Sequence, residues 1–217
     1  MTDFADLRRT MVDTQIRPSD VTKFPILDAM LNVPREKFVP DAQRAVAYSG
    51  DDIPLGGGRV VLAPRSLAKM LEALDISGDE LVLDIGSGMG YSAAVVARMA
   101  EAVVAVEDDE GTLEEAQSAL SETGADNVIL HKGALSDGAA EHGPYDVILV
   151  QGAAEQLPTA IADQLKEGGR IACIFMENAL GTFCVGVKVD GDIAWRHEYN
   201  LSAPVLPGFE RESTFAL

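Results

Sequence analysis

The chain has 217 residues, enough for one α/β domain and too few for two domains of full size. Hydrophobic residues make up 47% of it and charged residues 24%, a balance that excludes wholesale disorder. Seventeen basic against thirty-five acidic residues give a net charge of −18, which argues against nucleic acid or an anionic membrane surface as a partner.

The cysteine count and the first residues indicate a cytoplasmic protein. Cys173 and Cys184 are too few for a disulfide framework or a spaced zinc cluster, so we expect buried free thiols. The first thirty residues carry charges and no apolar run, so no secretory signal is expected. No stretch approaches the roughly 18 apolar residues that a membrane span requires.

Charge divides the chain into two unequal parts. Residues 1–75 hold ten basic and eleven acidic residues, whereas residues 76–217 hold seven and twenty-four. We expect residues 1–75 to form a helical N-terminal extension with a substrate-side loop, and residues 76–217 to form a cofactor-binding α/β domain, the two packed as one compact unit.

The pattern of apolar residues predicts the elements in chain order. Helices are expected over residues 4–16, 22–32 and 65–74, and a glycine-rich loop over 47–64. Strands are expected over 81–85, 102–107, 127–131, 145–151 and 169–176, helices over 91–99, 111–123 and 158–165, and a closing antiparallel pair over 182–189 and 193–199. This alternation predicts an α/β fold, a doubly wound and mostly parallel sheet with an antiparallel C-terminal edge.

Ligands of such sheets bind beyond the carboxyl ends of the strands, so the first strand-to-helix turn is the place to look. Residues 84–91 read DIGSGMGY, where Gly86 and Gly88 allow a ligand to approach bare backbone. Glu107 ends the next predicted strand, where its carboxylate can accept hydrogen bonds from both hydroxyls of a ribose. Together these features predict an adenosine-type nucleotide.

Two residues favour S-adenosylmethionine over a dinucleotide. The dinucleotide fingerprint GxGxxG requires glycine where this chain has Tyr91. Asp84 precedes the first glycine by two residues and would attract a sulfonium or an amino group but repel a pyrophosphate. A nicotinamide-dependent oxidoreductase stays an alternative, as does a loop in which the glycines only turn the chain.

Three stretches resemble the protein-L-isoaspartate O-methyltransferases, a family of class I S-adenosylmethionine-dependent methyltransferases. They are VPREKFV at residues 33–39, the PLGGG loop at 54–58 and VLDIGSGMGY at 82–91. The resemblance implies a methyltransferase sheet with a variant order of its last strands. It also implies the cofactor-binding residues Gly86, Ser87, Gly88, Gly90, Glu107, Ala134 and Leu135, of which the glycine loop wraps the methionine part, Glu107 holds the ribose, and Ala134 and Leu135 border the adenine. Asp84 is added to the cofactor-binding residues because of its charge. Family members usually have an acidic residue at the position of Ala134.

The substrate side departs from the family pattern. The family has a Thr-Ile-Ser-x-Pro type of segment whose serine faces the reacting carboxylate, whereas residues 60–64 read VVLAP and place Leu62 at the hydroxyl position. The candidates for substrate binding are Arg59, Val61, Leu62 and Arg65, and either arginine could hold a carboxylate through two hydrogen bonds. No catalytic side chain is identified.

Two hypotheses therefore stand. The first is an S-adenosylmethionine-dependent O-methyltransferase acting in protein repair on a carboxylate of a protein, peptide or small molecule. The second is a family member that keeps the cofactor site but acts on another acceptor or serves as a non-catalytic interaction protein. His131, His142 and His197 look scattered and lack spaced carboxylate or thiol partners, so no metal site is predicted.

Overall fold

A seven-stranded sheet forms the centre of the structure, a computed structural model that describes residues 3–211. Its strands stand in the order β5-β4-β3-β6-β7-β8-β9. Their bounds are β3 Leu81–Ile85, β4 Ala102–Glu107, β5 Val128–Lys132, β6 Tyr145–Ala154, β7 Leu165–Glu177, β8 Leu180–Val189 and β9 Asp192–Asn200. The pairs from β5 to β7 are parallel, and β8 and β9 add antiparallel pairs. The predicted fold class, with its antiparallel C-terminal edge, is confirmed.

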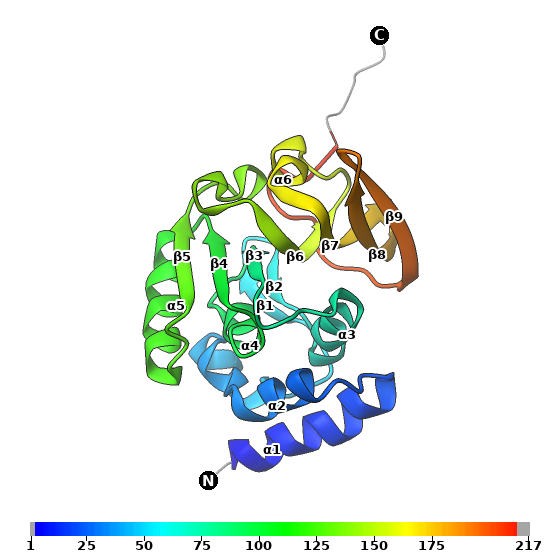
Figure 1. The fold of residues 1–217 in the computed structure, drawn as a ribbon. Coiled ribbons are helices and arrows are strands. Elements are labelled where there is room, and N and C mark those ends of the chain that lie inside the picture. Colours follow the sequence, from blue (N-terminus) through cyan, green and yellow to red (C-terminus); the bar gives the residue numbers. More distant parts are fainter. Residues whose placement is uncertain (1–2, 212–217) are drawn as a thin grey trace.

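Six α-helices accompany the sheet in the described part of the chain. They are α1 Phe4–Met11, α2 Phe24–Asn32, α3 Pro64–Leu74, α4 Tyr91–Val96, α5 Glu110–Thr123 and α6 Thr159–Asp163. Helices α1 to α4 lie together on the lower side of the sheet in Figure 1, α5 lies beside β5, and α6 lies at the upper end. Within residues 3–211, no helix is long and apolar enough to cross a membrane.

Alternate residues of the central strands face two separate apolar clusters. Val82 and Val103 belong to the cluster shared with α1 to α4, whereas Leu83 and Val104 belong to a second cluster on the opposite face. Successive side chains of a strand point to opposite faces, so this division means that both faces of the sheet are buried. The clusters explain why these strands read as continuous apolar runs in the sequence.

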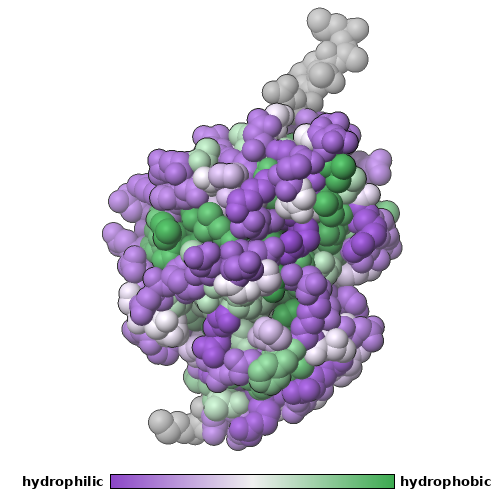
Figure 2. All heavy atoms as spheres, in the orientation of Figure 1, coloured by the Kyte–Doolittle hydropathy of each residue, from purple (hydrophilic) through white to green (hydrophobic). Residues whose placement is uncertain are grey.

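Hydrophilic residues occupy most of the face shown in Figure 2, with smaller hydrophobic areas between them.

Cys173 and Cys184 lie opposite each other on β7 and β8 as buried free thiols, as the sequence predicted.

The segment predicted as a loop contains a small antiparallel hairpin. Strands β1 (Ile53–Gly56) and β2 (Arg59–Val61) pair in a separate two-stranded sheet. Gly56, Gly57 and Gly58 all have positive φ angles, which a residue with a Cβ rarely adopts, and they turn the chain between the strands. Strands of three or four residues are too short to show the alternation of apolar and polar residues that indicates a strand, so the sequence predicts only the turn.

A buried arginine joins parts of the N-terminal extension to the start of α4. Arg35 is fully buried and donates hydrogen bonds from Nε to the Ala47 carbonyl (2.7 Å) and from Nη2 to the Leu62 carbonyl (2.9 Å). Its guanidinium also lies 4.6 Å from the centre of the Tyr91 ring, at the start of α4. One side chain of the VPREKFV stretch therefore holds both the extension and the segment that follows β2.

We expect Arg35→Met to lower the free energy of unfolding by about 2–4 kcal/mol, because two buried carbonyls lose their donor. Urea unfolding followed by circular dichroism measures this change. Arg44→Met is the matched control, since Arg44 belongs to the same extension but is half exposed and pairs with Asp41. Equal effects of the two substitutions would contradict the role given to Arg35.

Candidate functional site

The glycine loop joins β3 to α4 at the carboxyl edge of the sheet. Gly86, Gly88 and Gly90 have φ angles of 75°, 56° and 90°, all in the region that favours glycine. A Cβ at Gly88 would lie 2.5 Å from the Leu55 side chain. The loop therefore keeps a bare backbone facing the hairpin.

Parallel pairing places Glu107 beside this loop. Ile85 on β3 pairs with Val106 on β4, so the residues that follow each of them lie side by side. Glu107 is 1% exposed, and its Oε2 accepts a hydrogen bond of 2.8 Å from the Gly88 amide. The acid and the glycine loop thus form one site, because the ends of neighbouring parallel strands meet at one edge.

Arg59 from β2 covers the carboxylate of Glu107. Its Nη1 donates to Oε1 at 3.0 Å and its Nη2 donates to Oε2 at 2.8 Å, a bidentate ion pair whose side chains are 10% and 2% exposed. Arg59 also contacts Asp108. Both oxygens that a ribose would use are therefore engaged by a side chain of the hairpin.

A cavity of about 340 Å³ opens between these elements. Its walls come from the hairpin (Leu55 and Arg59), the glycine loop (Gly88), the end of β4 (Glu107) and the C-terminal segment (Pro207). The cavity lies where the sequence predicted the cofactor.

Asp84 lies beneath the loop and does not line the cavity. It is fully buried, and its oxygens accept hydrogen bonds from Ser92 Oγ (2.6 Å) and from Gln151 Nε2 (2.9 Å). Burial raises the pKa of this carboxyl from 3.8 to about 6, although both hydrogen bonds oppose the shift. In this structure Asp84 therefore binds neighbouring side chains beneath the loop, and its carboxylate does not face the cavity.

Ser87, Ala134 and Leu135, also expected to bind the cofactor, differ in how deeply they are buried. Ser87 is 5% exposed, and its buried Oγ has no hydrogen-bond partner within the described chain. Leu135 is buried in the second apolar cluster and Ala134 is exposed. The amide of Gly133, just before them, donates to the Glu107 carbonyl (3.2 Å), which keeps this loop next to the site.

The unpartnered hydroxyl of Ser87, the glycine backbone and the paired oxygens of Glu107 fit S-adenosylmethionine. These groups offer hydrogen bonds to ribose hydroxyls and to an amino acid group. Arg59 is the one cation among the described groups around the cavity, and it is already paired with Glu107, so a pyrophosphate would lack a positively charged partner.

The residues expected on the substrate side are divided between core and surface. Val61 and Leu62 are buried, at 8% and 2% exposure, in the apolar cluster shared with the N-terminal helices. The amide of Ala63 donates to Asp52 Oδ1 (2.6 Å), a second polar contact that holds this segment. Arg65 is exposed and makes no ion pair with the residues of 3–211.

The sequence did not assign the C-terminal segment to the site. Ala153 on β6 donates to the Pro204 carbonyl (2.8 Å) and accepts from the Leu206 amide (2.9 Å), so this segment runs along β6. The Leu206 side chain covers Gly86, and Pro207 lines the cavity. Only the tertiary structure shows that this segment borders the cavity.

Two of the three histidines that look isolated in the sequence come together in the fold. His131 and His142 lie on either side of Glu141, whereas His197 lies on β9 and does not belong to this group.

The fold and the site together define a class I methyltransferase, with a mostly parallel sheet, a glycine loop after its first strand and a carboxylate at the end of the next. The family described as Protein-L-isoaspartate(D-aspartate) O-methyltransferase (PCMT) matches residues 8–194. The chain belongs to this family. It is thus an S-adenosylmethionine-dependent methyltransferase, and the nicotinamide-dependent alternative is dropped.

Individual relatives agree with this assignment. The protein-L-isoaspartate O-methyltransferase of Roseiflexus sp. is 37% identical over 78% of this chain and 77% of its own length, and that of Opitutus terrae is 40% identical over 76% and 70%. A solved protein-L-isoaspartate O-methyltransferase superposes with a TM-score of 0.79 at 25% identity, over 95% of this chain and 66% of that one. A putative Plasmodium falciparum enzyme of the same name, in complex with S-adenosyl-L-homocysteine, has the same fold at TM-score 0.79 and 18% identity, over 95% of this chain and 99% of that one.

The first prediction from the site concerns pH. Below pH 3.8 Asp84 is protonated in both the folded and the unfolded chain. Between pH 3.8 and about 6 only the folded state keeps this proton, so the free energy of unfolding falls as pH rises. Asp84 therefore contributes a decrease of about 3 kcal/mol in the free energy of unfolding over this range. Urea unfolding at about pH 4 to 7 should show this contribution in the wild type and not in Asp84→Asn. Exposed Asp163→Asn is the control, and parallel profiles of wild type and Asp84→Asn would contradict the assignment.

The second prediction concerns the hairpin. Because Arg59 must leave Glu107 before a ribose can bind there, Arg59→Gln should tighten S-adenosylhomocysteine binding roughly threefold to tenfold. Isothermal titration calorimetry measures the dissociation constant, and Arg98→Gln, on a more exposed ion pair with Asp28, is the control. Weaker binding in Arg59→Gln would show that the arginine contacts the bound cofactor.

Proposed function

We propose that this enzyme methylates the free carboxylate of isoaspartyl residues in proteins and peptides, and so acts in protein repair. Membership of the family, over residues 8–194, carries the proposal. The glycine loop and Glu107 support it, because they form an adenosine site without phosphate-binding groups. An acidic surface and the buried free thiols of Cys173 and Cys184 support a cytoplasmic location.

The cofactor supplies an electrophilic methyl group on a positively charged sulfur. The chain supplies position: Glu107 accepts hydrogen bonds from the ribose, and the Gly86–Gly90 backbone allows close approach to the rest of the molecule. A carboxylate acceptor is already ionised at neutral pH, so no strong base is required, and alignment and exclusion of water account for the catalysis. The hairpin β1–β2 covers the site and would exclude water when it closes.

The substrate side relies on other groups than a serine hydroxyl. Leu62 is part of the core, and its carbonyl and the next amide are held by Arg35 and Asp52. The segment therefore offers an ordered backbone at the place where a hydroxyl would otherwise act. Arg65, exposed at the start of α3, is the cation that we propose to bind the acceptor carboxylate.

The test compares two peptides of one sequence, one with an isoaspartyl and one with an aspartyl residue. With radiolabelled S-adenosylmethionine, we expect base-labile methyl esters, measured as released methanol, from the isoaspartyl peptide only. Arg65→Gln should raise KM for the peptide about tenfold or more and leave KM for the cofactor unchanged, since a charge-assisted pair is worth roughly 1.5–3 kcal/mol.

A Glu107→Gln variant provides the control, because it should raise KM for the cofactor and leave that for the peptide unchanged. Cofactor binding without methylation of either peptide would overturn the proposed acceptor and favour another acceptor or a non-catalytic role. An unchanged peptide KM in Arg65→Gln would remove the arginine from the site.

A further inference from the structure

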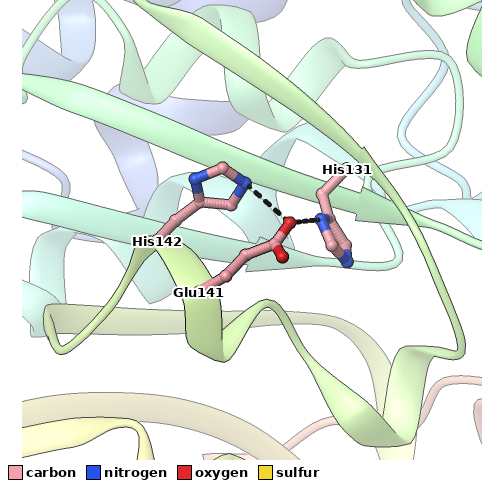
Figure 3. Close-up of side chains that lie close together, drawn as sticks. All are labelled: His131, Glu141 and His142. Atoms are coloured by element: carbon pink, nitrogen blue, oxygen red, sulfur yellow. Dashed lines mark ion pairs between the residues drawn. The ribbon is translucent and has the colours of Figure 1, made fainter.

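His131, Glu141 and His142 form a compact group away from the cavity. His131 lies near the end of β5, and the other two lie on the 3₁₀ turn Ala140–His142. In Figure 3 a carboxylate oxygen of Glu141 lies between the two imidazole rings. This oxygen, Oε1, is 3.4 Å from His131 Nδ1 and 3.4 Å from His142 Nε2, and the three atoms lie within 4.8 Å of one another.

The two separations of Glu141 Oε1 from the histidine nitrogens suit metal ligands better than hydrogen bonds. A charge-assisted N–H···O bond spans about 2.7–2.9 Å, well below the observed separation. Zinc bonds of about 2.0–2.2 Å at the tetrahedral angle place neighbouring ligand atoms about 3.3–3.5 Å apart. We propose that His131, Glu141 and His142 bind a divalent transition metal ion, with Zn²⁺ as the preferred ion.

The donor set and its exposure match this class of ion. Two imidazoles and a carboxylate suit Zn²⁺, and three protein ligands leave a fourth position for water. The side chains of His131, His142 and Glu141 are 21%, 33% and 69% exposed, so an ion reaches them from solvent. The net charge of −18 raises the local concentration of cations.

The backbone that carries these ligands is already held in place. Tyr145 donates from its hydroxyl to the Ala139 carbonyl (2.6 Å), and the Ala139 amide donates to Gln164 Oε1 (2.9 Å). The amide of His142 donates to the same Ala139 carbonyl (3.1 Å). Only side-chain torsions have to adjust on binding, which keeps the entropic cost low.

Metal binding would connect the two ends of one loop. His131 precedes Gly133, whose amide contacts the Glu107 carbonyl, and the other two ligands follow the loop. An ion at this site would therefore restrain the loop that contains Ala134 and Leu135. We expect added ZnCl₂ to raise the melting temperature of the cofactor-free enzyme, because the ion binds the assembled site of the folded state more tightly than the unfolded chain.

The test is calorimetric titration of the full chain with ZnCl₂ in excess Mg²⁺, which occupies weak carboxylate sites. We expect one ion per chain in the wild type, and affinity at least about tenfold lower in His131→Ala and in His142→Ala. His197→Ala is the matched control and should bind as the wild type does. Substitution with Co²⁺ should give the visible absorption bands of a four-coordinate site.

Glu141→Gln keeps the shape of the side chain and should also weaken binding, which guards against misfolding of the histidine variants. Circular dichroism confirms that each variant is folded. No binding in the wild type, or equal affinity in the wild type and a His131→Ala/His142→Ala double variant, would overturn the proposal.

Discussion

The site is organised around the buried carboxylate of Glu107. A charged group that is 1% exposed requires partners, and it receives them from the Gly88 amide and from Arg59. These two contacts bring together the end of β4, the glycine loop and the hairpin, three segments that are distant in the sequence. If the ribose of the cofactor binds Glu107 as we propose, its hydroxyls have to displace the arginine from the same two oxygens.

A second buried charge connects separate parts of the N-terminal extension. Arg35 takes the place of an apolar core residue, and its hydrogen bonds reach the carbonyls of Ala47 and Leu62. Burial lowers the pKa of its guanidinium, and the ring of Tyr91 partly offsets this cost. Tyr91, which argued against a dinucleotide in the sequence, therefore also packs the first turn of α4 against the extension.

Some of the sequence predictions were incomplete for local reasons. The hairpin β1–β2 was expected as a loop, because three or four residues on each side of a glycine turn do not establish a period. The helix expected over residues 158–165 ends at Asp163, where β7 begins two residues later. Arg59 was one of two arginines considered for substrate binding, and the sequence did not indicate its pairing with Glu107.

The sequence by itself determined the strands of the seven-stranded sheet, the glycine loop, the acid at Glu107 and the family, because apolar periodicity and local spacing are properties of adjacent residues. Only the tertiary structure decided which side chains from separate segments meet. The pairing of Arg59 with Glu107, the burial of Asp84 beneath the loop, the passage of Leu206 over Gly86 and the meeting of His131 with His142 all depend on how distant segments pack. Contacts of this kind form only when distant segments pack around the two apolar clusters, and no local sequence pattern predicts them.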